Sequence, residues 1–73
     1  IMKAEGTLAG VSDLILLYPS KGFHALCIEM KTEKGRQQPS QKLFQRAVEE
    51  MGYKYIICRS FEAFMDEIRA YLK

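Results

Sequence analysis

The sequence lacks several features that would assign it to a familiar functional class. No apolar run in its 73 residues approaches the roughly 18 that a membrane span requires, and we expect no signal peptide. It holds only two cysteines, Cys27 and Cys58, which are too few for a disulfide framework and lie among aliphatic residues. We therefore expect buried thiols in a reducing, cytoplasmic setting. The lone histidine, His24, lies at a strand start and is interpreted as structural.

Neither the net charge nor the internal organisation of the sequence indicates a particular function. The net charge of +2 is too small to indicate a nucleic-acid partner by itself. No repeat, linker or low-complexity segment divides the chain. The hydrophobic content of 48% excludes disorder and predicts one globular domain over residues 1–73, of marginal stability when alone. Because the chain begins Ile1-Met2-Lys3, with no start of its own, we expect it to be a piece of a longer protein.

Two aliphatic runs predict a β-hairpin. Residues 13–18 form the first run, and their composition suits a strand that is covered on both faces. Residues 24–31 form the second, and the turn signal Pro19-Ser20-Lys21-Gly22 separates them. We therefore expect an antiparallel pair.

A polar loop over residues 32–38 then leads to a predicted helix. Pro39 suits its first turn and Gly52 its end. The apolar residues at helical spacing are Leu43, Phe44, Ala47, Val48 and Met51. Residues 53–58 read as a third strand, so residues 24–58 form a β-α-β unit with parallel strands and a right-handed crossover.

A last helix completes the predicted fold. Ser60 is a favourable N-cap, and Glu62 lies in the first turn, where the helix dipole favours an acid. The apolar stripe of this helix is Phe61, Phe64, Met65, Ile68 and Leu72, which we interpret as core rather than as a platform for bases. The predicted class is α/β, with a hairpin followed by β-α-β-α and a mixed three-stranded sheet flanked by helices.

Three residues in the hairpin can carry chemistry. Glu29 and Lys31 are two apart in a strand, so both side chains point to one face, while Leu26, Ile28 and Met30 point to the core. Asp13 opens the neighbouring strand. The carboxylates of Asp13 and Glu29, with the backbone carbonyl of Met30, offer the hard oxygen ligands that Mg²⁺ prefers.

The cations nearby suggest a substrate. Lys31 can orient a metal-bound water or offset charge on a phosphate, which is the chemistry of a phosphodiesterase. Lys34, Arg36 and Lys42 follow and can hold neighbouring phosphates. The alternatives are an ordinary solvated surface for these cations, and for Glu29 and Lys31 a surface ion pair worth at most about 1 kcal/mol.

The sequence resembles the VRR-Nuc branch of the PD-(D/E)xK nuclease superfamily, particularly its stand-alone phage and prophage members. The similar segments cover residues 3–14, 28–32, 34–36, 39–41 and 52–59. The resemblance implies a restriction-endonuclease-like fold and DNA cleavage that depends on Mg²⁺ or Mn²⁺. It also implies a cytoplasmic site of action in a bacterial host cell, if a phage or prophage encodes the chain.

The resemblance also assigns residues. Asp13 matches the acid of the Pro-Asp motif, although Ser12 replaces the proline, and Glu29 and Lys31 match the (D/E)xK motif. Gln41 matches a glutamine that opens the next helix and contacts a metal-bound water or the phosphate backbone. An exposed first-turn residue is the alternative interpretation of Gln41.

Further implications concern what accompanies this domain. The family has an upstream helix, often with another acid near the metal, and we expect that helix to precede residue 1, since Glu5 is no obvious substitute. Small members resemble Holliday-junction resolvases and dimerise, so we expect a homodimer that acts on DNA, including branched DNA. A non-catalytic DNA-binding module with the same fold is the alternative function.

Overall fold

A three-stranded sheet forms the middle layer of the computed structural model, which describes residues 10–73. Its strands are β1 (Leu14–Leu16), β2 (Leu26–Met30) and β3 (Lys54–Cys58), side by side in that order. β1 runs antiparallel to β2, and β2 runs parallel to β3. The predicted hairpin, the parallel pair and the α/β class are therefore confirmed.

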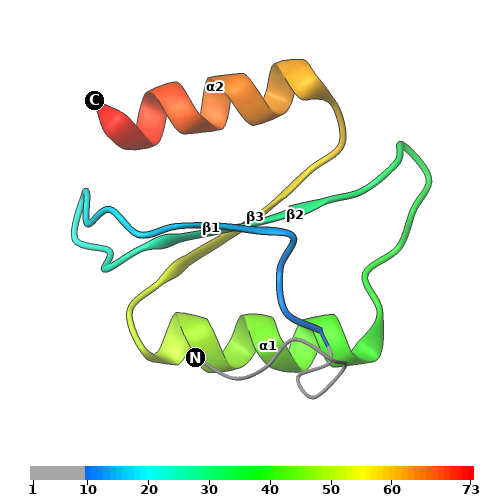
Figure 1. Ribbon diagram of the computed structural model, residues 1–73. Helices are drawn as coiled ribbons and strands as arrows, with labels where there is room; N and C mark the ends of the chain where they lie inside the picture. Colours follow the sequence, from blue (N-terminus) through cyan, green and yellow to red (C-terminus); the bar gives the residue numbers. More distant parts are fainter. Residues whose placement is uncertain (1–9) are drawn as a thin grey trace.

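Two helices cover opposite faces of the sheet, α1 (Pro39–Glu50) on one and α2 (Phe61–Leu72) on the other (Figure 1). The alternation of β2 explains this arrangement. Leu26 and Ile28 pack into a cluster with residues of α2, whereas Cys27 packs with Val48 of α1. Side chains therefore cover β2 on both faces, as is usual for a strand in a β-α-β unit.

The helix ends follow local signals in the sequence. Pro39 is the first residue of α1, and Gly52 follows the helix with a φ of 89°, a conformation that favours glycine. At the start of α2, the Ser60 hydroxyl accepts a hydrogen bond from the Ala63 amide at 3.0 Å. Glu62 lies in the first turn, so the predicted cap and charge of α2 are both confirmed.

The tip of the hairpin is a tight turn that is tied to α2. Ser20 and Phe23 exchange two backbone hydrogen bonds across Lys21 and Gly22, whose φ angles of 54° and 87° are both positive. The buried hydroxyl of Tyr71 donates to the Tyr18 carbonyl at 2.6 Å. The loop and the last turn of α2 thus hold each other in position.

The prediction that residues 13–18 form a strand covered on both faces is wrong. β1 spans only three residues at the edge of the sheet, and Leu14 and Ile15 are exposed. Leu17, at 82% exposed, already lies beyond the strand. The reason is tertiary, because within residues 10–73 β1 pairs with β2 alone at the edge of the sheet, whereas both helices pack mainly over β3.

The predicted apolar stripes of both helices are only partly correct. On α1, Phe44 and Val48 face the sheet, but Leu43, Ala47 and Met51 are exposed, since a sheet of three strands covers only a narrow part of the helix. On α2, the exposed residues include Phe61 and Leu72. The prediction missed Tyr71, which is 1% exposed and packs with Phe64 and Ile68.

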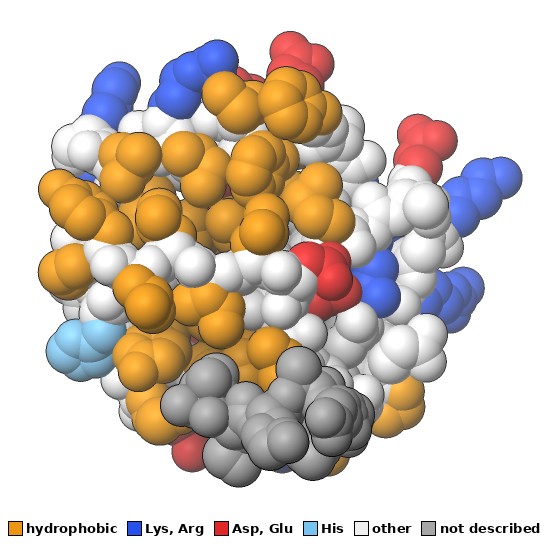
Figure 2. All heavy atoms as spheres, viewed as in Figure 1, with side chains coloured by type: hydrophobic (Ala, Val, Ile, Leu, Met, Phe, Trp, Pro, Cys, Tyr) orange, Lys and Arg blue, Asp and Glu red, His pale blue; other side chains and the backbone are white. Residues whose placement is uncertain are grey.

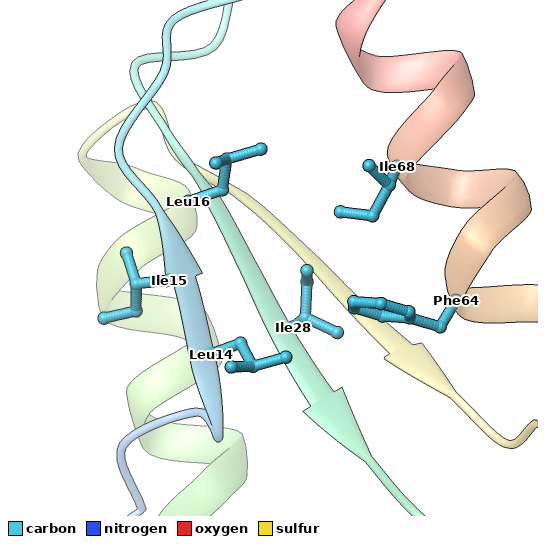
Figure 3. A pocket seen from close by; sticks show the side chains of 6 residues that line it. All are labelled: Leu14, Ile15, Leu16, Ile28, Phe64 and Ile68. Atoms are coloured by element: carbon cyan, nitrogen blue, oxygen red, sulfur yellow. The ribbon is translucent and has the colours of Figure 1, made fainter. Parts of the chain in front are cut away.

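One face of the molecule carries an apolar groove between β1 and α2. Leu16 points toward Ile68 of α2 and Leu14 toward Phe64 of the same helix, with Ile28 of β2 between β1 and α2 (Figure 3). Hydrophobic side chains also gather over this region in the space-filling view (Figure 2).

Neither helix is long and apolar enough to cross a membrane within residues 10–73. The expectation about Glu5 falls outside the described residues.

Candidate active site

Asp13 is fixed against the end of β2. Its Oδ2 accepts a hydrogen bond from the backbone N–H of Met30 at 2.8 Å. The preceding Ser12 is buried, and its hydroxyl donates to the Leu14 carbonyl at 3.2 Å. The hairpin therefore brings Asp13 to the strand that carries Glu29, as the sequence predicted.

Glu29 is a buried carboxylate with one satisfied and one unsatisfied oxygen. Its Oε2 accepts a hydrogen bond from Nε2 of Gln41 at 2.8 Å and lies 3.7 Å from Nζ of Lys31. Its Oε1 is buried and has no hydrogen-bond partner among the described residues. Native proteins rarely leave a buried polar atom in this state, so this oxygen is a candidate ligand for a metal ion.

Gln41 is held at both ends of its side-chain amide. Its carbonyl oxygen accepts from the backbone N–H of Gln38 at 2.7 Å, as in a capping box, while its amide nitrogen donates to Glu29. Gln41 is half-buried, and neither interpretation of the sequence included its contact with Glu29. The start of α1 therefore orients the Glu29 carboxylate directly.

The surroundings of Glu29 disfavour its charge. Burial raises the pKa of Glu29, and the negative charge of Asp13 raises it further, whereas Lys31 lowers it. A buried acid beside a second acid is a common sign of a functional site, since a bound cation would offset both the cost of burial and the repulsion between the two charges.

The residues present fit a divalent metal ion in part. Residues 10–73 contain no group of three or more His, Cys, Asp or Glu side chains arranged to hold a metal. Magnesium needs only one or two carboxylates, however, because it keeps several of its waters. Asp13 and the unsatisfied oxygen of Glu29 supply these, and Met30, whose N–H faces Asp13, directs its carbonyl to the same side of β2.

The predicted DNA-binding residues lie around the carboxyl end of β2. Lys34 and Arg36 are exposed in the connection to α1, and Lys42 is exposed on the helix. No contact joins these three to the carboxylates among the described residues. Acidic and basic side chains do lie next to one another beside the hydrophobic region (Figure 2).

Two positions near the site escaped sequence reasoning. Gly10 lies against the first turn of α1, where a Cβ would overlap the Ser40 carbonyl. Arg59 donates from Nη1 to the carbonyls of Thr32 and Gly35. Both contacts join segments that are distant in sequence, so no local pattern signals them.

Comparison with protein-family models also identifies a nuclease domain. Residues 2–62 match the model of the VRR-NUC domain, which is most of the chain. Neither the curated proteins nor the solved structures provided a match. On the strength of the family match and the geometry above, this chain belongs to the VRR-NUC domain family, which implies a nuclease of the PD-(D/E)xK type.

Proposed function

We propose that the chain is a metal-dependent DNA endonuclease that hydrolyses phosphodiester bonds and selects its substrate by DNA structure, as Holliday-junction resolvases do. Asp13, Glu29, Lys31 and Gln41 are its proposed catalytic residues. The observation that carries the proposal is the buried Glu29 carboxylate, which has one unsatisfied oxygen beside a second acid and a lysine.

Each side chain has a distinct task. Mg²⁺ or Mn²⁺, held by Asp13, Glu29 and the Met30 carbonyl, would supply a Lewis acid and lower the pKa of a bound water. Gln41 orients the Glu29 carboxylate through its hydrogen bond. The cation of Lys31 opposes the effect of burial on the pKa of Glu29 and offers positive charge where the phosphate becomes more negative.

The exposed cations are proposed to bind the DNA backbone. Lys34, Arg36 and Lys42 would contact phosphates next to the cleaved bond, which gives affinity without reading base sequence. Binding that depends on three phosphate contacts weakens as salt increases, because the counterions released from the DNA gain less entropy at higher salt. We also propose a homodimer and a cytoplasmic site of action.

The test is cleavage of duplex, flap and four-way-junction DNA with and without Mg²⁺. We expect cleavage only with the metal, and we expect Glu29→Ala and Lys31→Ala each to lower it at least about a hundredfold, since each removes a group that acts on the reacting atoms. Glu50→Ala and Lys73→Ala serve as controls, because both side chains are exposed and lie outside the proposed site.

Two outcomes would contradict the proposal. Undiminished cleavage by either site variant, with circular dichroism showing a folded protein, would remove these residues from the mechanism. Binding to branched DNA with steep salt dependence, but without any metal-dependent cleavage, would instead identify a non-catalytic DNA-binding module.

A further inference from the structure

Arg59 closes a turn in the connection between β2 and α1. Its Nη1 donates to the Thr32 carbonyl at 2.9 Å and to the Gly35 carbonyl at 2.6 Å. The Thr32 carbonyl also accepts from the Gly35 N–H at 3.1 Å, so residues 32–35 form a turn. Both carbonyls of the turn therefore point at one guanidinium nitrogen.

This turn is tight and leaves little room for rearrangement. A Cβ at Gly35 would lie 3.0 Å from the Thr32 hydroxyl. Further along, Gln37 donates to Oε1 of Gln45 and to the hydroxyl of Tyr55. The connection is thus attached near its start by Arg59 and near its end by Gln37, with Arg36 between the two attachments.

Arg59 also lies at the same end of the sheet as the proposed catalytic lysine. Met30 pairs with Cys58 in the parallel register, and the Lys31 N–H donates to the Cys58 carbonyl at 2.9 Å. Lys31 and Arg59 directly follow this pair, at the ends of strands that lie about 4.8 Å apart. Figure 1 shows the connection leaving the sheet where β2 and β3 both end.

We propose that Arg59 is a positioning residue of the nuclease site, an inference that rests on the function proposed above. By holding the turn at residues 32–35, Arg59 fixes the backbone directly after Lys31 and the loop that carries Lys34 and Arg36. A permanently charged guanidinium suits this task, since it can satisfy two carbonyls at once. Without it, the loop samples other conformations and Lys31 loses its fixed approach to the phosphate.

The kinetic test separates positioning from direct phosphate binding. In Arg59→Met, we expect the single-turnover rate at saturating DNA to fall about 10- to 100-fold, because small displacements of catalytic groups have effects of this size. Arg59→Lys should recover most of the rate, since an ammonium can donate to both carbonyls. Arg69→Met removes the same charge from an exposed ion pair on α2 and should keep the wild-type rate.

The opposite results would overturn the proposal. If the rate of Arg59→Met at saturating DNA were within twofold of wild type, Arg59 would not be a positioning residue. If that variant also weakened binding and lowered the salt slope by about one phosphate contact, Arg59 would instead be a phosphate ligand.

A second measurement needs neither DNA nor metal. We expect amide hydrogen exchange at Gly35 to be at least tenfold faster in Arg59→Met than in wild type or Arg69→Met, because the turn opens more often. Unchanged exchange would overturn the proposal even if cleavage were lost. If the wild-type protein cleaved no DNA, the proposed function would fail, while the exchange rates would still decide whether Arg59 holds the turn.

Discussion

At Glu29, the proposed catalytic role and the stability of the fold place opposite demands on one carboxylate. The carboxylate is 3% exposed, and one of its oxygens has no partner among the described residues. Leaving a buried polar atom unsatisfied costs about 1–3 kcal/mol, and a negative charge increases the penalty. Such a group persists in a fold when a ligand or a reaction requires it, and here that requirement is proposed to be a metal ion.

This conflict predicts that Glu29→Gln stabilises the metal-free protein at neutral pH. Because the folded state raises the pKa of Glu29 above its usual 4.5, folding favours the protonated form, and wild-type stability falls as pH rises through the folded-state pKa. We expect the variant to gain about 1 kcal/mol at pH 7, or about 4–8 °C in Tm, and to lose this advantage near pH 4.

Thermal unfolding of both proteins at the two pH values, without metal, measures the effect. Glu50→Gln is the control, since it makes the same substitution at an exposed carboxylate outside the proposed site. A lower Tm for Glu29→Gln at pH 7 would contradict the prediction. In addition, Mg²⁺ should raise the Tm of wild type but not of Glu29→Gln.

Gly10 is the second residue with a measurable consequence. Its φ is 86°, and a side chain there would overlap the carbonyl of Ser40, next to Gln41. We expect Gly10→Ala to destabilise the fold by at least about 2 kcal/mol and to lower cleavage, because left-handed strain adds to the displacement of α1.

Gly22 provides the matched control for this substitution. It has a similar φ of 87°, but no described atom lies within 4 Å of the position of its Cβ. Gly22→Ala should therefore show the strain alone, about 1–2 kcal/mol, with normal cleavage. Equal denaturant midpoints and equal activities for the two variants would show that contact with Ser40 is unimportant.

At the scale of elements, boundaries set by short-range chemistry were predictable. Pro39, Gly52 and Ser60 act on their own turn of backbone, so each marks a helix end through local chemistry. The exposure of β1 was not predictable in the same way, because an aliphatic strand has the same sequence pattern at the edge of a sheet as in its middle. Tyr71 was missed since its burial depends on the hairpin that lies against it.

The same distinction applies to the candidate site, where contacts set by nearby sequence were predictable and contacts set by tertiary packing were not. A hairpin between two aliphatic runs was enough to predict that Asp13 approaches the strand of Glu29. The contact of Gln41 with Glu29 depends on how α1 is rotated over the sheet, and the contact of Arg59 with Thr32 on where β3 ends. Sequence periodicity predicts neither the rotation of α1 over the sheet nor the residue at which β3 ends.

The attachment of the hairpin to α2 predicts an effect on stability alone. Tyr71→Phe removes the hydrogen bond to the Tyr18 carbonyl and should lower stability by about 1 kcal/mol, or about 4–8 °C in Tm. Cleavage should be unchanged, because the tie lies at the opposite end of β2 from Glu29. Tyr18→Phe keeps the carbonyl and should retain wild-type stability, so equal losses in both variants would contradict this assignment.

At the scale of the whole molecule, size is the basis for expecting a dimer. A chain of 73 residues buries a smaller fraction of its surface than a typical domain, and paired cuts on a junction require two sites at fixed separation. We expect sedimentation at micromolar concentration to give twice the chain mass of 8.4 kDa. A monomer mass across the micromolar range would contradict the homodimer.

The hairpin also has a consequence for the order in which the chain folds. Joining β1 to β2 closes a short connection, whereas the bonds of Arg59 to Thr32 and of Tyr71 to Tyr18 span 27 and 53 residues. Short closures cost less conformational entropy, so the hairpin is expected to form before β3 and α2 dock. A partly folded chain would therefore already hold both carboxylates together, while the loop after Lys31 becomes ordered only in the last step of folding.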